Sequence, residues 1–404
     1  MQGPWFELPV VILLVGAGII AAALVRALLS RLRVPALVGW ILLGLAVRLA
    51  DNRWGFLSRG GDEVFDFLAN LGVIVLLFRV GLEANLAGLV RQLRRASLVW
   101  AGNVFLSAAL GYGVCAFVLG LGVVPSLFVA FAFTATSVGV SVGVWQDAGL
   151  LGSPDGQLLV DAAELDDLSG ILLMAVLFAV APLLAGHGGG SLLPLLGRTV
   201  WPMLLKLVVF VAACAAFSQF AERRVTAFFS RLHSRSGPVL LLTGAGFILA
   251  AAARLGGFSV AIGAFFAGLA FSRDPKSGRY DAAYGVLYDL LAPFFFIGIG
   301  LSIQPSVLLP ALGLGAVLLA AAFLSKVVGT ALPTLPGSGL RRSVVLGLSM
   351  VPRAEIATVI MLRGATLGEW AVSPRLFAAM VVVVAATSIV TPLVVRPLLR
   401  RASE

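Results

Sequence analysis

Residues 157–182 read QLLVDAAELDDLSGILLMAVLFAVAP, an apolar span of helical length that carries four carboxylates and no basic residue. The four acids are Asp161, Glu164, Asp166 and Asp167. In a helix that begins near residue 157 and rises about 1.5 Å per residue, Asp166 lies roughly 14 Å from the start, near the middle of a hydrocarbon core about 30 Å thick. An ionised Asp at that depth costs about 2.5–3.5 kcal/mol, so such residues usually have a function and a partner. The adjacent carboxylates of Asp166 and Asp167 are therefore the first candidates for a functional centre.

The composition around this segment is that of a membrane protein. Hydrophobic residues make up 60% of the 404 residues and charged residues 12%, against roughly 25% charged residues in an ordinary soluble domain. Apolar runs of spanning length recur along the chain, and only helices or closed barrels satisfy the backbone inside a bilayer. Because Ala, Leu, Val and Gly recur without strict alternation, the sequence predicts an all-α polytopic membrane protein.

The apolar runs, and the Pro, Gly and charge breaks between them, predict thirteen membrane helices. They span residues 5–30, 35–50, 63–84, 97–121, 125–145 and 157–182, then a linking helix near 199–220, then 237–254, 257–272, 284–303, 308–332, 341–363 and 376–398. Six helices, a linker and six helices predict two halves, with the second inverted relative to the first. Inverted repeats are typical of transporters.

The basic residues predict the orientation of these helices. With the N-terminus outside, 18 Lys and Arg residues flank the helices on the cytoplasmic side and 7 flank them on the other side. The cytoplasmic set is Arg26, Arg31, Arg33, Arg91, Arg94, Arg95, Arg223, Arg224, Arg231, Arg235, Arg273, Lys276, Arg279, Arg341, Arg342, Arg396, Arg400 and Arg401; the outer set is Arg48, Arg53, Arg59, Arg198, Arg254, Arg363 and Arg375. This bias predicts an N-out, C-in topology. The formal charge of +10 is thus interpreted as a set of topology determinants and not as a nucleic-acid surface.

The two halves share an irregularity in their fifth helices. The first half carries Thr134-Ala135-Thr136-Ser137-Val138-Gly139, and the second carries Ser349-Met350-Val351-Pro352-Arg353-Ala354-Glu355. Proline removes a helical hydrogen bond, and clustered Thr, Ser and Gly can satisfy a freed backbone. Both helices are therefore expected to be discontinuous, with close packing of small residues as the alternative for the first stretch.

Polar residues on other helices reach a depth similar to that of Asp166. The same arithmetic places Thr136 about 16 Å from the outer face, and Arg353 and Glu355 about 18–21 Å from the cytoplasmic face. Lys326 lies about 9 Å from the cytoplasmic end of its helix, and its long side chain reaches farther in. The predicted ion- and proton-binding residues are Asp166, Asp167, Lys326, Thr136 and Ser137.

Adjacent carboxylates on a helix point about 100° apart and repel each other if both are ionised. Burial and repulsion favour the protonated form, whereas an opposing lysine favours the charged form, so the pair suits competition between a proton and a cation. Sodium prefers oxygen ligands, which Asp167, Asp166 and Thr136 can supply. The alternative is a purely structural ion pair between Asp166 and Lys326, which leaves Asp167 without a role.

Further charges receive supporting roles. Arg353 and Glu355, two residues apart beside Pro352, are interpreted mainly as groups that compensate the ends of half-helices. Glu164 lies one turn before Asp167 and is either a third proton site or a vestibule charge. Asp161 is interpreted as a helix-start residue or as part of a cytoplasmic funnel.

Motifs of chemical catalysis are missing from the sequence. It contains no P-loop, dinucleotide fingerprint or metal-ligand cluster, and no candidate nucleophile with a base. We therefore expect no enzymatic activity and no cofactor apart from transported ions.

Five stretches together carry a family resemblance. They are Phe133-Thr134-Ala135-Thr136-Ser137-Val138-Gly139 continuing to Asp147-Ala148-Gly149-Leu150-Leu151, Ala162-Ala163-Glu164-Leu165-Asp166-Asp167-Leu168, Leu76-Leu77-Phe78-Arg79-Val80-Gly81-Leu82-Glu83, Ser325-Lys326-Val327-Val328-Gly329 and Val351-Pro352-Arg353-Ala354-Glu355. In this combination, over nearly the whole chain, the sequence resembles the monovalent cation:proton antiporters of the Kef and NapA type.

This resemblance implies an NhaA-like fold of two inverted repeats with crossed, discontinuous helices. It implies a mobile core domain and a panel that forms a homodimer. By position, the panel comprises residues 1–96 and 237–304, the linking helix lies in 186–236, and the core comprises 97–185 and 305–404.

The resemblance also implies roles for single residues. Asp167 is expected to be the essential ion-binding carboxylate, and Asp166 is expected to exchange its salt bridge with Lys326 for a proton or an ion. A paired Asp-Asp implies the electrogenic type. The chain departs from the family pattern at Glu164, Asp161, Arg79 and Ala354, and the two additional acids bear on the proton stoichiometry and the pH dependence.

The sequence therefore predicts a secondary transporter of the inner (plasma) membrane that exchanges Na⁺ or Li⁺ for H⁺ by alternating access. A K⁺/H⁺ antiporter of the Kef type is the nearest alternative. A sensor or scaffold without transport is a weaker alternative because Asp166, Asp167 and Lys326 are all present. An organic-anion symporter on the same fold is also weaker, since it would favour a larger and less acidic cavity.

Overall fold

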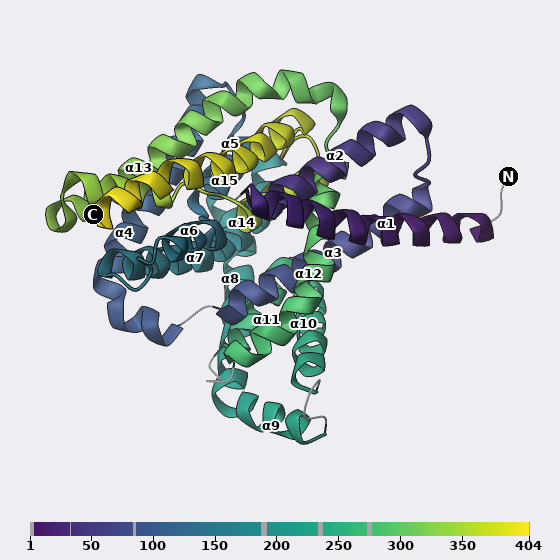
Figure 1. Ribbon diagram of the computed structural model, residues 1–404, viewed down its shortest axis with the longest axis horizontal. Helices are drawn as coiled ribbons and strands as arrows, with labels where there is room; N and C mark the ends of the chain where they lie inside the picture. Colours follow the sequence, from purple (N-terminus) through teal and green to yellow (C-terminus); the bar gives the residue numbers. More distant parts are fainter. Residues whose placement is uncertain are drawn as a thin grey trace. The chain divides into compact units, whose positions relative to one another are not determined.

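A computed structural model describes residues 4–32, 34–83, 86–186, 192–232, 237–272 and 277–403. The regular structure of these residues is helical, as the sequence predicts (Figure 1). The helices are α1 Pro4–Arg31, α2 Ala36–Trp54, α3 Arg59–Glu83, α4 Leu86–Gly113 with a π-helical turn Val114–Val118, α5 Val123–Thr134, α6 Val138–Asp147, α7 Pro154–Ala185, α8 Leu192–Phe220, α9 Glu222–Leu232, α10 Gly237–Leu255, α11 Val260–Phe271, α12 Ser277–Leu301, α13 Pro305–Ser349, α14 Glu355–Leu367 and α15 Pro374–Ser403. The chain divides into a first unit, Met1–Asn85 with Pro202–Pro305, and a second unit, Leu86–Trp201 with Ser306–Glu404.

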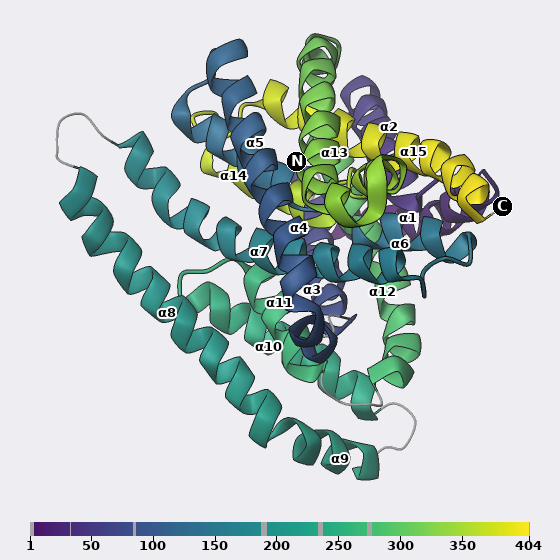
Figure 2. The same ribbon diagram turned by 90° about the vertical axis from the view of Figure 1, so that its left-hand side faces the viewer.

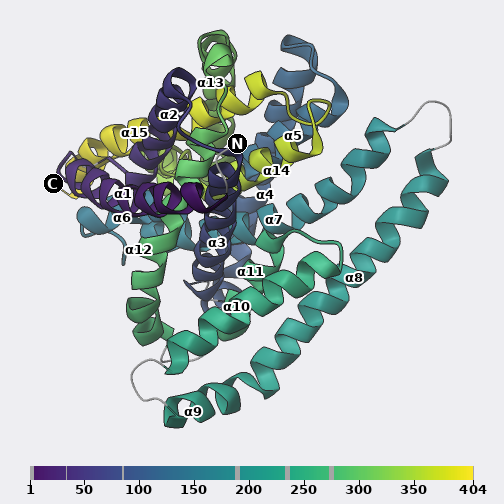
Figure 3. The ribbon, with the colours of Figure 1, turned by 90° about the vertical axis from the view of Figure 1, so that its right-hand side faces the viewer.

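Helices of the first unit approach one another closely. α3 packs against α11 and α12, α2 packs against α12, and α10 packs against α11 (Figure 3). Glycines permit this approach, because a Cβ atom at Gly44 or Gly268 would overlap the backbone carbonyl of Ile297 or of Phe78. Small residues at helix contacts let backbones come close, which is how membrane helices gain packing energy.

In the second unit, α5 packs against α4, α7 and α14 (Figure 2), and α4 also packs against α7. α4 meets α13 at a pair of glycines, since a Cβ atom at Gly102 would lie 2.7 Å from the carbonyl oxygen of Gly329. This close approach brings polar residues of α4 within reach of α7 and α13.

Two helices of the second unit are interrupted, at the stretches that the sequence predicts. α5 ends at Thr134 and α6 begins at Val138, and the backbone between them is extended. α13 ends at Ser349 and α14 begins at Glu355. We call residues 135–137 the first break and residues 350–354 the second break. The amide of Ser137 donates a 2.7 Å hydrogen bond to the carbonyl of Pro352, so the two breaks are in direct contact.

A further interruption lies within α13, at Gly339. Its φ of 73° and ψ of 164° are not helical, and glycine adopts a positive φ without strain. The predicted helix ended near residue 332, but the observed helix continues through Pro333 and Pro336 to this glycine. Prolines are tolerated in membrane helices because neighbouring groups can satisfy the freed carbonyls.

Several helices are long and apolar enough to cross a membrane. Within the described residues there are eight by length and composition, or nine if the bent pair Leu205–Phe220 and Glu222–Phe228 is one span. Val239–Leu255 and Val260–Phe271 are apolar but shorter. The number of such helices is below thirteen for three reasons. α10 and α11 are short, and α2 carries three charges near its end. The 45 residues of α13 are one helix, where the sequence predicts parts of two. The chain is a multi-pass membrane protein, and thirteen spans stay a prediction.

Candidate functional site

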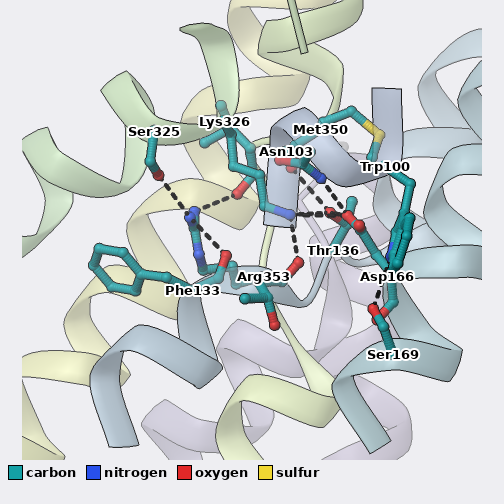
Figure 4. A network of polar contacts seen from close by, with 12 residues as sticks. Trp100, Asn103, Phe133, Thr136, Asp166, Ser169, Ser325, Lys326, Met350 and Arg353 are labelled. Carbon is teal, nitrogen blue, oxygen red and sulfur yellow. Dashed lines mark hydrogen bonds and ion pairs between the residues drawn. The ribbon is translucent and has the colours of Figure 1, made fainter. Parts of the chain in front are cut away.

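Polar side chains converge inside the second unit, where the two breaks meet α4, α7 and α13 (Figure 4). Asp166 and Asp167 come from α7, Lys326 from α13 and Thr136 from the first break. The discontinuity matters because it frees backbone groups at mid-helix, where α5 ends and α6 begins.

One oxygen of Asp166 receives three hydrogen bonds. Its Oδ2 accepts from Lys326 Nζ at 2.9 Å, from Thr136 Oγ1 at 2.6 Å and from Asn103 Nδ2 at 2.5 Å (Figure 4). Both Asp166 and Lys326 have 0% exposed side chains. Buried charges are tolerated when they are paired and hydrogen-bonded, so these donors stabilise the ionised form of Asp166.

The ammonium group of Lys326 is fully coordinated. Besides Asp166, it donates to the backbone carbonyl of Thr134 at 2.6 Å and to Thr136 Oγ1 at 2.7 Å. Three acceptors match the three N–H donors of a lysine. Thr134 is the last residue of α5, so the lysine also compensates the negative end of that half-helix.

Asp167 has a different environment. Its side chain is 8% exposed, and no described residue donates a hydrogen bond to it or forms an ion pair with it. The charges that act on it are those of Glu355, Asp166, Lys326 and Glu164, three of which are acidic. Of the two adjacent carboxylates, Asp166 is thus held by donors from three elements, whereas Asp167 faces mainly other acids.

Arg353 is buried without a carboxylate partner among the described residues. Its guanidinium donates to the carbonyls of Val351 at 2.9 Å and of Phe133 and Ala322 at 3.2 Å each. It also lies 4.7 Å from the centre of the Phe133 ring. Phe133 lies in the last turn of α5, and Val351 follows the end of α13, so the guanidinium group satisfies carbonyls beside both breaks. This geometry is compatible with compensation of half-helix ends, which stays a prediction for Arg353.

The remaining predicted residues lie beside this network. Ser137 Oγ donates to Glu355 Oε2 at 3.4 Å, across the two breaks. Glu355 is the first residue of α14, where a negative charge is favoured. Glu164 is half-buried on α7, one turn before Asp167. The structure thus brings Asp166, Lys326 and Thr136 into direct contact.

The sequence argument missed Asn103. It lies on α4, is fully buried, and makes the 2.5 Å hydrogen bond to Asp166. Its signal was a single amide within the apolar run Val99-Trp100-Ala101-Gly102-Asn103-Val104-Phe105. Depth alone did not distinguish it, because depth does not say which face of a helix meets which neighbour.

The site offers carboxylate, hydroxyl and carbonyl oxygens. Such ligands suit a hard cation, and the buried lysine provides a competing positive charge. Groups of three or more His, Cys, Asp and Glu side chains that could hold a metal ion are not found in the part of the chain that the structure describes. The arrangement can exchange one positive charge for another at a pair of carboxylates.

Comparison with known proteins agrees with this chemistry. The family profile described as "Sodium/hydrogen exchanger, transmembrane" matches residues 19–401. The high-affinity Na⁺/H⁺ antiporter NhaS3 of Synechocystis sp. is 30% identical over 340 residues, which cover 82% of this chain and 70% of that protein. The Na⁺/H⁺-K⁺ antiporter GerN of Bacillus cereus is 27% identical over 364 residues, which cover 90% of this chain and 89% of that protein.

A solved structure shares the fold. The sodium proton antiporter MjNhaP1 of Methanocaldococcus jannaschii aligns with a TM-score of 0.68 at 15% sequence identity. The alignment covers 97% of this chain and 98% of that one, so the likeness extends over both units.

Proposed function

The chain belongs to the sodium/hydrogen exchanger family of transporters, and on this premise we propose that it exchanges Na⁺ or Li⁺ for H⁺ by alternating access. The observation that carries the proposal is that two adjacent buried carboxylates have different partners. Asp166 is paired with Lys326 at 2.9 Å, whereas Asp167 has no such partner in the described residues. One acid holds an exchangeable internal cation, and the other is free to take an external one.

Asp167 binds the transported cation. Asp166 and Thr136 supply further oxygen ligands, and Ser137 and carbonyls freed at the breaks lie near them. Support comes from the contact of Thr136 with Asp166 at 2.6 Å and from the residual 8% exposure of Asp167.

Asp166 and Lys326 act as the switch. As the cation loads, Lys326 gives up a proton and leaves Asp166, and the charge of the cation faces the two carboxylates. When two protons return, they bind Asp167 and Asp166, and the proton on Asp166 then passes to Lys326, so that the ion pair forms again. If two protons exchange for one Na⁺, each cycle moves net charge, and a membrane potential contributes about 2.3 kcal/mol per charge per 100 mV. The transporter is then electrogenic.

The transporter has thirteen membrane helices in two inverted repeats, with the N-terminus outside and the C-terminus inside, in the plasma membrane. Residues 97–185 and 305–404 form the mobile core, and residues 1–96 and 237–304 form a panel that makes a homodimer. What supports the core is that the second unit is compact by itself and contains both breaks and the ion pair.

K⁺/H⁺ exchange is the second candidate. The name of the relative GerN includes both Na⁺ and K⁺, and the oxygen ligands of the site do not discriminate between these ions by type. Flux driven by Na⁺, Li⁺ and K⁺ in turn decides between the two. Uptake of an organic anion, or ion-dependent thermal stabilisation without flux, would favour a symporter or a sensor instead.

The direct test is cation-dependent proton flux in proteoliposomes. We expect Na⁺ or Li⁺ to drive flux in the parent and Asp167→Asn to abolish it, because the amide cannot neutralise the cation. Asp155→Asn, in the first turn of the same helix, is the matched control and should keep the parent rate. Exchange at the normal rate in Asp167→Asn would contradict the proposed site, and a rate insensitive to imposed potential would contradict electrogenicity alone.

A further inference from the structure

Asn103 donates a hydrogen bond to Asp166, and the exchange mechanism described above assigns no role to it. Its Nδ2 lies 2.5 Å from Asp166 Oδ2 (Figure 4). The side chain is fully buried and comes from α4, which carries neither the breaks nor the switch lysine.

The three donors on Asp166 differ in what happens to them during exchange. Lys326 is charged and must leave when a cation replaces it. The amide of Asn103 and the hydroxyl of Thr136 are neutral and remain. Hydrogen bonds to an ionised acceptor are stronger than those between neutral groups, so these two groups stabilise the carboxylate in the interval without the lysine.

Two buried oxygens beside this bond have no partner among the described residues. They are Oδ1 of Asn103 and Oδ1 of Asp166, on side chains joined by the 2.5 Å contact. A carboxylate accepts only, so it needs the N–H of the amide. A protonated carboxyl donates, and the amide oxygen can accept from it after the amide group turns. An amide is therefore a partner for both protonation states.

Resting on the proposed exchange function, we propose that Asn103 is a positioning residue for Asp166 that serves both of its protonation states and thereby sets the pH at which the site changes from proton to cation.

A substitution of Asn103 leaves the charged residues around Asp166 and Asp167 in place. Lys326 on α13 and Arg353 at the second break act on Asp166, and Asp167 neighbours it on α7. Glu355 on α14 and Glu164 on α7 act on Asp167. In the described residues the side chain of Asn103 forms a hydrogen bond with Asp166 and with none of these other groups, so its replacement changes the amide alone.

A packing role is the competing explanation, because Asn103 follows Gly102 at the contact of α4 with α13. Packing predicts a loss of stability and of maximal rate with an unchanged pH profile. The positioning role predicts a shifted pH profile with a retained maximal rate. The two explanations therefore differ in a measurable quantity.

The test compares Asn103→Leu, Asn103→Asp and Asn103→Ser with Ser107→Ala. Ser107 lies one turn farther along α4, is fully buried, and also has a hydroxyl without a partner in the described residues. In proteoliposomes we expect Asn103→Leu to move the pH profile of flux to higher pH by about half a unit to one unit, because the bond of the amide to the carboxylate is stronger than its bond to the protonated carboxyl. Asn103→Asp should shift it farther, Asn103→Ser less, and Ser107→Ala not at all.

A second readout does not depend on transport. The infrared band of protonated carboxyl groups is titrated against pH in the parent and in Asp166→Asn, and the difference between the two gives the signal of Asp166. The same difference is then measured with Asn103→Leu present in both proteins. A midpoint moved to higher pH with no flux in the parent would support this inference and contradict the proposed function. Normal parent flux with an unmoved midpoint and pH profile in folded Asn103→Leu and Asn103→Ser would overturn the inference and leave the exchange function intact.

Discussion

The first and second breaks of the second unit lie in contact, yet their side chains differ in charge. The first break, residues 135–137, is neutral, and Thr136 takes part in the ion pair of Asp166 with Lys326. The second break, residues 350–354, contains Arg353, whose bonds go to backbone carbonyls and a serine hydroxyl. In the proposed function, the first break therefore contributes to cation binding and the second break to stability.

The end of α5 explains this division. Its last two carbonyl groups belong to Phe133 and Thr134, and they accept from Arg353 and Lys326 respectively. A helix C-terminus carries a partial negative charge, which these cations compensate. Arg353 bonds to uncharged groups, whereas Lys326 also bonds to the carboxylate of Asp166. In the proposed exchange, Arg353 therefore keeps its bonds at the end of the broken helix while Lys326 leaves.

The largest effect is expected for Arg353→Met. It leaves up to three buried carbonyls without their donor, at about 1–3 kcal/mol each, so the protein should lose about 3 kcal/mol or more of stability. Thermal unfolding in detergent measures this loss. The matched control is Arg375→Met, because Arg375 also donates to a carbonyl, that of Pro310 at 3.1 Å, but is exposed. Equal melting temperatures for both variants would contradict the structural role of the second break.

An intermediate effect is expected for Thr136→Val, which keeps the shape of the side chain and removes its hydroxyl. The carboxylate of Asp166 loses a donor and the cation loses a ligand, so the apparent KM for the cation should rise about tenfold, or about 1.4 kcal/mol. Stability should fall by only about 1 kcal/mol. Thr134→Val is the control, since the Thr134 hydroxyl bonds only to its own helix, at Phe131. A KM unchanged in Thr136→Val would remove the first break from the binding site.

Both breaks could be predicted from the sequence because their causes are local. Pro352 removes a backbone donor, and Thr136 with Ser137 offers alternative hydrogen bonds. The contact of Asp166 with Lys326 could also be predicted, because a buried charge in an apolar helix requires an opposite charge at the same depth. The energetic penalty is large, so the possible partners are few.

The lateral neighbours could not be predicted. Asn103 reaches Asp166 because α4 approaches closely at Gly102, and that approach depends on the rotation and packing of whole helices. The continuation of α13 through Pro333 was likewise decided by its surroundings and not by its own sequence. Helix depth follows from the order of residues along the chain, whereas helix rotation follows from the neighbours.

The smallest effect is expected where a side-chain hydrogen bond joins the first break to the start of α14, between Ser137 and Glu355. Glu355→Gln keeps an acceptor but removes a negative charge that acts on Asp167. Asp167 then ionises more readily, so the pH profile of cation-dependent flux should move to lower pH by about half a unit or less. Loss of the charge at the start of α14 should cost about 0.3–1 kcal/mol. Ser137→Ala removes the bond and leaves the charge, so its pH profile should match that of the parent. Identical shifts in the two variants would mean that the hydrogen bond, and not the charge, couples the second break to the ion site.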